Sequence, residues 1–243
     1  MTLLPTLNRT KLLERFLRSA IDFETSTPGM IIVDEIDWDK NKDKYENIEK
    51  TCLPQYWQFV KTKSIKMGDK IREVWPQVKS TDASWVNILN DDHLIKTKFW
   101  DKKLVSKLDG TNFVTCNDGW MSPRKASGAT MFSMPLLEAI NVPIYLPGML
   151  HLFIDDLWET IGRSTGCWDI DHSVLIEHHN QLKTPNERDQ TFYAVYGKGP
   201  DLHNAELWKN DEKVYQNFIR NDFITTRNKI RKLRGQLEVK YNS

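Results

Sequence analysis

Residues 85–93, WVNILNDDH, indicate more about the fold than any other stretch of this chain. A short apolar run of strand-favouring residues ends abruptly in Asp91, Asp92 and His93. Such a run, bounded by polar residues, is typical of a buried parallel strand. Open α/β sheets bind ligands just beyond the carboxyl ends of their strands. The stretch therefore predicts two carboxylates and an imidazole at the ligand-binding edge of a sheet.

These three side chains have the chemistry of a metal site. Hard divalent cations take carboxylate oxygens, and manganese also accepts imidazole, so the cluster suits Mg²⁺ or Mn²⁺ carrying nucleotide phosphates. An isolated Asp-Asp pair is more commonly an acidic turn that caps a helix or faces water. The choice between a metal site and an acidic turn therefore depends on the other motifs in the chain.

Composition narrows the class of protein. The 243 residues are 40% hydrophobic, which is enough for the core of one α/β domain or a domain with an appendage. The 34 basic and 33 acidic residues nearly cancel, so overall charge favours neither a nucleic-acid coat nor a membrane-surface protein. Cys52, Cys116 and Cys167 lie far apart, which argues against a disulfide framework or a zinc site. With neither a signal peptide nor a membrane-length apolar run, we expect a cytoplasmic protein.

The order of expected elements is that of a mostly parallel sheet covered by helices, an α/β fold. Residues 39–50 have no apolar period and are expected to be an exposed excursion. Expected strands are 3–4, 30–33, 85–89, 113–116, 129–134 and 172–176, and expected helices are 12–20, 65–78, 136–140, a helix from about 155 to Gly162 or Gly166, and one or two helices in 206–238.

Polar clusters follow four of the apolar elements. They are residues 34–37, residues 91–93, Asp155 with Asp156, and residues 177–179. Carboxylates and imidazoles converge where a metal needs several ligands, although each cluster could also be an independent solvated loop. The recurrence favours one shared site.

In this order the motifs resemble the nucleotide-diphospho-sugar transferases of the GT-A fold, particularly short glycosyltransferase-like proteins common in phages and bacteria. The resemblance covers roughly residues 3–182. It implies a three-layer sandwich in which residues 1–182 form the catalytic domain and residues 183–243 a helical extension packed on it. The motifs are residues 90–93 (NDDH), 100–101 (WD), 117–118 (ND), 151–155 (HLFID) and 176–178 (IEH).

The resemblance implies a metal-dependent glycosyltransferase that moves a sugar from a nucleotide-diphosphate donor to a hydroxyl acceptor. Asp92 and His178 would ligate Mn²⁺ or Mg²⁺, which neutralises the leaving nucleoside diphosphate. Asp155 would remove the proton of the acceptor hydroxyl, as in inverting members of the family. The residues implied to contact the donor are Thr6, Arg9, Asp37, Asp91, Asp118 and His151.

Simpler roles remain open for several of these residues. Asp155 could be a helix N-terminal charge favoured by the macrodipole. His93 and His151 could be structural histidines as readily as phosphate contacts, and His179 matches no family residue. Many transferases carry a three-acid variant of the Asp91-Asp92 motif, so the number of metal ligands also stays open.

Other functions fit the sequence less closely. Nucleotidyl transfer uses related sheets but usually brings a glycine-rich loop after the first strand, and residues 6–10 (TLNRT) contain no glycine. Residues 155–159 (DDLWE) resemble a prenyl-transfer motif, yet the strand-rich first half argues against that all-helical fold. A nucleotide- or carbohydrate-binding module with a degenerate site is the non-enzymatic alternative.

The C-terminal segment leaves the acceptor undefined. Residues 223–236 contain five basic residues and no acidic one, and a basic helix can bind the phosphate backbone of nucleic acid. A terminal helix that packs on the catalytic domain through its apolar residues is the more ordinary explanation.

Overall fold

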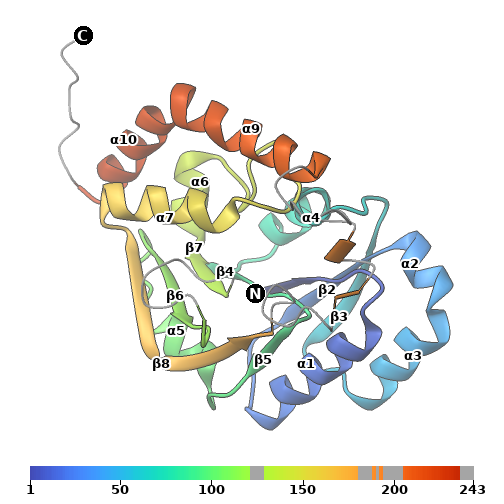
Figure 1. Cartoon of the computed structure of the whole chain (residues 1–243). Coiled ribbons are helices and arrows are strands. Elements are labelled where there is room, and N and C mark those ends of the chain that lie inside the picture. The colour runs from blue at the N-terminus through green and yellow to red at the C-terminus, as the bar shows by residue number, and fades with distance from the viewer. Residues whose placement is uncertain (121–128, 180–187, 190–191, 194–204, 236–243) are drawn as a thin grey trace, which may run out of the picture.

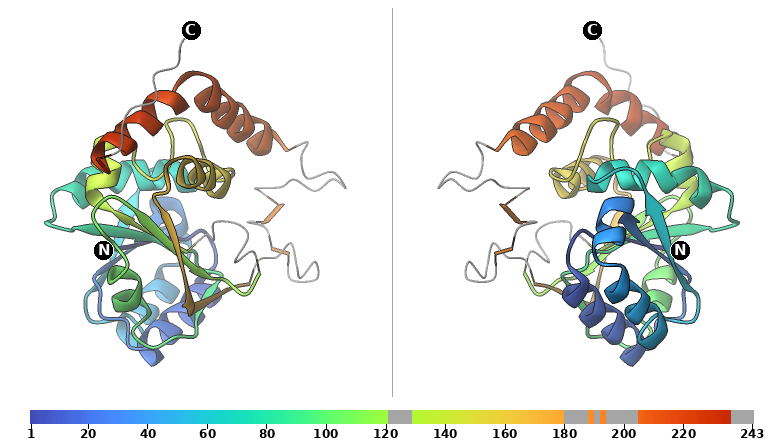
Figure 2. Two further views of the ribbon diagram at one scale, coloured as in Figure 1. Left: turned by 90° about the vertical axis from the view of Figure 1, so that its left-hand side faces the viewer. Right: turned by 90° about the vertical axis from the view of Figure 1, so that its right-hand side faces the viewer.

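The computed structural model describes residues 1–120, 129–179, 188–189, 192–193 and 205–235. An eight-stranded sheet, ordered β3-β2-β1-β4-β7-β6-β8-β5, lies between two layers of helices (Figures 1 and 2). The strands are β1 (Thr2–Pro5), β2 (Gly29–Asp34), β3 (Trp57–Thr62), β4 (Trp85–Ile88), β5 (His93–Ile95), β6 (Phe113–Asn117), β7 (Thr130–Ser133) and β8 (Trp168–His178).

One half of the sheet is entirely parallel. Strand β1 pairs with β2 and β4, and β2 pairs with β3, all in parallel. Strand β7 runs antiparallel to β4 and β6, and β5 runs antiparallel to β8, whereas β6 and β8 are parallel. The expected α/β fold with a mostly parallel sheet is confirmed.

Helices cover both faces of the sheet. The face that carries the C-terminal helices is packed by α4 (Met67–Lys79), α6 (Met134–Ile140), α7 (Ile154–Thr165), α9 (Glu206–Asn221) and α10 (Phe223–Leu233). The opposite face is packed by α1 (Thr10–Asp22), α2 (Glu35–Lys40), α3 (Lys42–Thr51) and α5 (Trp100–Val105). No helix in the described parts of the chain is long and apolar enough to cross a membrane.

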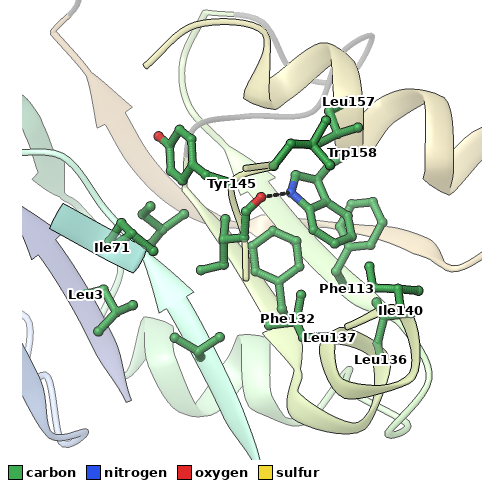
Figure 3. Close-up of a cluster of buried hydrophobic side chains, with 14 of the residues drawn as sticks. Leu3, Ile71, Phe113, Phe132, Leu136, Leu137, Ile140, Tyr145, Leu157 and Trp158 are labelled. Atoms are coloured by element: carbon green, nitrogen blue, oxygen red, sulfur yellow. Dashed lines mark hydrogen bonds between the residues drawn. The ribbon is translucent and has the colours of Figure 1, made fainter. Parts of the chain in front are cut away.

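Strand residues alternate between two cores because successive side chains point to opposite faces of a sheet. Leu3 lies in the core beneath α4 and α7, whereas Leu4 lies in the core beneath α1 and α3. Burial on both faces explains why these strands have continuous apolar runs. In the first core, Trp158 packs against Phe113 and Phe132, and its indole N–H donates to the Ile144 carbonyl at 2.9 Å (Figure 3).

The expectation of an exposed excursion over residues 39–50 is wrong. Residues 42–51 form α3, whose Tyr45 and Ile48 are 0% and 2% exposed. Tyr45 stacks on Trp38 of α2 at a centroid distance of 5.3 Å. A helix that buries only one aromatic and one aliphatic side chain leaves too few apolar positions for a periodic pattern.

Helix α4 continues through Pro76 to Lys79, close to the end expected at residue 78. Proline removes one helical hydrogen bond, but Val74 and Val78 on either side are buried in the core. Helix α7 ends at Thr165, and Gly166 follows with a φ of +68°, as expected for a C-terminal glycine.

The C-terminal helices belong to the same core as the sheet. Helices α9 and α10 lie over α6 and α7 (Figure 1), and Phe218 and Ile230 are buried among the residues around Trp158. The expected boundary between residues 182 and 183 falls outside the described residues.

Candidate active site at the end of β4

The candidate site lies where the parallel strands β1, β2 and β4 end. Thr6 follows β1, Asp34 ends β2, and the turn after β4 carries Asp91 and Asp92. Carboxyl ends of parallel strands meet at one edge of a sheet. All four residues are less than 9% exposed, so this edge is buried polar surface.

Asp91 is held by residues from the β1–α1 turn. Thr6 Oγ1 donates to its carboxylate at 2.7 Å, and Arg9 Nη1 lies 3.3 Å from the other oxygen. Arg9 also lies 3.7 Å from Asp92 and makes a 2.9 Å ion pair with Asp189. Burial raises the pKa of Asp91 to about 6, although the Arg9 charge opposes this shift.

Asp92, His93 and His178 converge. Strand β5 pairs antiparallel with β8 so that His93 lies opposite His178. His178 Nε2 is 3.4 Å from Asp92 Oδ1, and the three potential ligand atoms lie within 4.8 Å of one another. The pairing therefore joins a turn near residue 92 to a strand end near residue 178.

Hydrogen bonding separates the roles of the two histidines. His93 Nδ1 accepts from the Asn90 N–H at 3.1 Å, so neutral His93 carries its proton on Nε2 and cannot offer that nitrogen to a metal. Asp92 Oδ1 is buried without a hydrogen bond from any described residue. Asp92 and His178 could therefore hold a cation. Two protein ligands suffice for Mg²⁺ or Mn²⁺ at a nucleotide, because phosphates and waters complete the shell.

Charges around Asp92 keep it ionised. Burial alone would raise its pKa, but the hydrogen bond and charge of His178, together with the Arg9 charge, outweigh burial and hold the pKa below the usual range. Burial likewise opposes the charge on His178, yet Asp92 raises the pKa of that imidazole. Burial lowers the pKa of His93 to about 3, so this histidine stays neutral. The site thus pairs one carboxylate with one basic imidazole.

Asp118 and Asp155 lie within electrostatic range of the same imidazole. Both carboxylates help to raise the pKa of His178. Asp118 is 2% exposed, accepts from the Trp120 N–H at 2.8 Å, and its carbonyl accepts from His178 N. Asp155 lies half-buried in the first turn of α7. The residue after β6 therefore contacts the end of β8, and the carboxylate of Asp155 on α7 lies within electrostatic range of His178.

His151 lies in the loop before α7. Burial lowers its pKa to about 4, and the Arg9 charge acts in the same direction, which places Arg9 within electrostatic reach. The backbone N–H of His151 donates to Asp211 of α9 at 2.7 Å.

Asp37 makes its contacts within the protein. Its carboxylate accepts from the Asn8 N–H at 2.6 Å, from the Tyr45 hydroxyl at 2.8 Å and from Asn41 Nδ2 at 2.8 Å. Asn8 has a φ of +55°, so Asp37 stabilises an uncommon backbone conformation at the turn before Arg9. Its position supports the turn that carries the other candidates.

Sequence reasoning missed three residues near the site. Lys70 of α4 is 1% exposed and donates to the Thr6 carbonyl at 2.6 Å and to Asp34 at 3.0 Å. A basic residue on the apolar face of an amphipathic helix was its only signal. Trp120 is 38% exposed with its ring 6.0 Å from that of His178. The third, Asp211, gave no sequence signal because its partners lie about 60 residues away.

Comparison with known proteins supports the fold. No family model matches this chain, and no curated protein matches it. The mannosyltransferase PcManGT from Pyrobaculum calidifontis, solved with GDP-Man and Mn²⁺, matches with a TM-score of 0.56 and 12% identity over 95% of this chain and 72% of that chain.

Two further solved structures have similar scores. TarS from S. aureus matches with a TM-score of 0.53 and 14% identity over 91% of this chain but only 43% of TarS. A mycobacterial protein matches with a TM-score of 0.51 and 11% identity over 80% of this chain and 69% of that chain. The chain therefore has the GT-A-like fold that its motifs resemble.

Proposed function

We propose that this chain is a metal-dependent glycosyltransferase that moves a sugar from a nucleotide-diphosphate donor to a hydroxyl acceptor. The observation that carries the proposal is the approach of Asp92 Oδ1 and His178 Nε2 to 3.4 Å at the carboxyl end of β4. Support comes from the likeness in fold to a mannosyltransferase solved with GDP-Man and Mn²⁺. Ligands bind at this edge in open α/β sheets.

Asp92 and His178 would hold Mn²⁺ or Mg²⁺. When bound, such a cation acts as a Lewis acid on the diphosphate and stabilises the charge of the leaving group. Arg9 adds a guanidinium charge beside the two carboxylates and matches the geometry of phosphate oxygens. Thr6 and Asp91 would orient the nucleoside, and Asp118 and His151 would complete the donor contacts.

Asp155 would act as the general base. Its place at the N-terminus of α7 favours the ionised carboxylate, which a base requires. The acceptor O–H bond breaks and its proton moves to Asp155, while the acceptor oxygen bonds to the anomeric carbon. The bond from that carbon to the diphosphate breaks, and the nucleoside diphosphate leaves. Asp155 is near enough to raise the pKa of His178, which is consistent with a base near the leaving group.

A donor panel tests this proposal against its alternatives. Purified protein is melted with nucleotide sugars and with nucleoside triphosphates, each in Mn²⁺, in Mg²⁺ or in EDTA. A ligand at 100 times its Kd stabilises the native state by about 2.7 kcal/mol. We expect a nucleotide sugar to stabilise the protein only with metal and to be slowly hydrolysed to sugar and nucleoside diphosphate. Pyrophosphate release from a triphosphate would instead indicate nucleotidyl transfer, and binding without any turnover would indicate a binding module.

A further inference from the structure

A basic cleft opens beside the candidate site along the first two turns of α1. It has a volume of about 510 Å³. Its charged and ionisable lining consists of Arg9, Lys11, Arg15, Lys44, His179 and Asp189. The chain as a whole is nearly neutral, with a net charge of +1, so this concentration of cations is local.

Within the part of the chain that the structure describes, three of these cations have no acidic partner. Arg9 is paired with Asp189 and with the site carboxylates. Among the described residues no carboxylate forms an ion pair with Lys11, Arg15 or Lys44, and Lys44 donates only to the Asn41 side chain, at 3.0 Å.

Two neighbouring cations on the same helices, Arg18 and Lys42, do form ion pairs. Arg18 of α1 lies 2.7 Å from Glu14, and Lys42 of α3 lies 3.7 Å from Glu46. Among the described residues, the cations of α1 and α3 that line the cleft beyond Arg9 form no ion pair. An anion bound there would meet their charge without displacing an existing carboxylate.

Arg15 and the start of α1 also have hydrogen-bond donors to spare. Arg15 Nε and Nη2 are buried and make no hydrogen bond within the described parts of the chain. Buried donors without acceptors cost free energy, which a ligand with several oxygens would recover. Helix α1 has no side-chain cap and no acidic residue in its first turn, so its N–H groups and dipole also favour an anion. Phosphate meets all of these demands, because its oxygens fit a guanidinium fork.

We propose that this cleft binds a phosphate mono- or diester carried by the acceptor. The assignment to the acceptor rests on the proposed function, in which the donor diphosphate lies at Asp92 and His178. Arg9 lies at the end of the cleft nearest the donor site. Arg15 lies six residues beyond Arg9, about 9 Å further along the helix axis, which separates the Arg15 end of the cleft from the donor phosphates. The acceptor is then a hydroxyl compound that presents a phosphate to α1 while its hydroxyl reaches Asp155.

Inorganic phosphate is the probe for this cleft. The full chain is titrated with it calorimetrically in EDTA at low salt, so that the metal-dependent donor site does not contribute. We expect the Kd for phosphate to rise about tenfold in Arg15→Gln/Lys44→Gln, the loss expected for a pair of charge-assisted contacts. The matched control Arg18→Gln/Lys42→Gln removes two cations from the same helices and should leave the Kd within about twofold. Lys44→Gln alone should raise the Kd for phosphate by a smaller factor. This single variant replaces the double variant in the test if Arg15→Gln impairs folding.

A second titration distinguishes the acceptor from the donor. Both double variants are titrated with a nucleoside diphosphate in Mn²⁺, and we expect affinities equal to that of the unmodified chain. Absence of phosphate binding to the unmodified chain, or equal losses in the two double variants, would overturn the cleft assignment. A tenfold loss of nucleoside-diphosphate affinity in Arg15→Gln/Lys44→Gln would assign the cleft to donor phosphates and overturn the acceptor assignment. Failure of the proposed function would be seen separately, as no Mn²⁺-dependent nucleotide binding to the unmodified chain.

Discussion

Asp92 and His178 meet although they are 86 positions apart in the sequence. Each follows an apolar run, so the sequence predicts that both stand at strand ends. Their order and chemistry were therefore readable before the structure. The hydrogen bond from the Asn90 N–H to His93 could not be predicted from the sequence. A backbone donor, and the histidine tautomer that it selects, depend on the geometry of the turn.

Asp155 should act in the chemical step and not in donor binding. Asp155→Asn keeps the shape of the side chain but removes its basicity, so transfer to an acceptor should fall about 10² to 10⁴ fold. The affinity for nucleotide sugar should change little, and a binding titration beside a rate measurement separates the two effects.

The neighbouring acid provides the matched control. Asp156→Asn alters the same helix N-terminus by one charge and should leave the transfer rate within a few fold, because a dipole contact is worth about 0.3–1 kcal/mol. A purified Asp155→Asn protein with the unmodified rate would remove Asp155 as the base.

The sequence identifies Asp37 as a candidate site residue but does not show which residues contact it. Its place after a strand makes it a candidate from the sequence. Its carboxylate accepts hydrogen bonds from Asn8, Asn41 and Tyr45. Tyr45 lies on α3, the helix that the sequence pattern did not predict. The contacts of a side chain can be read only when the elements around it are known.

At the scale of elements, α9 holds the loop that leads into α7. Asp211 is 0% exposed, and its carboxylate accepts from the N–H groups of Leu150, His151 and Leu152 at 2.8, 2.7 and 2.7 Å. A buried charge is tolerated when several donors satisfy it. Helix α9 thereby holds the backbone of residues 150–152, just before α7.

Removal of the Asp211 charge should loosen this loop. Asp211→Asn places an amide among three N–H donors, and we expect the free energy of unfolding to fall by about 1–3 kcal/mol in urea titrations.

Glu212→Gln on the same turn of α9 is the control for Asp211→Asn. Glu212 is exposed, so its substitution should change stability by less than about 0.5 kcal/mol. Equal stability of both variants would show that the three short contacts do not hold the loop.

The alternation of strands and helices was predictable over much of the chain because each buried strand has a continuous apolar run. Strand β3 and the short elements β5 and α5 were not predicted. Strand β5 has only three residues, and its place depends on pairing with β8. Strand β3 lies at the edge of the sheet with an irregular burial pattern, so its sequence carries neither a continuous run nor a clean alternation.

At the scale of the whole molecule, the sheet and the C-terminal helices build one site. Strands β4 and β8 supply Asp92 and His178, α7 supplies Asp155, and α9 fixes the loop before α7. The two cores on either face of the sheet are continuous with the elements that carry these residues. The arrangement of these site residues therefore depends on the whole fold and cannot be read from any single sequence motif.

The most direct test of the account is the metal dependence of nucleoside-diphosphate binding in site variants. We predict that the unmodified chain binds a nucleoside diphosphate in Mn²⁺ and loses this binding in EDTA. Asp92→Asn and His178→Ala should each weaken the Mn²⁺-dependent binding by about 10–100 fold. The exposed residues in Asp82→Asn and His172→Ala are matched controls and should leave it unchanged. Mn²⁺-dependent binding that survives intact in both Asp92→Asn and His178→Ala, or no nucleoside-diphosphate binding with any metal, would contradict the account.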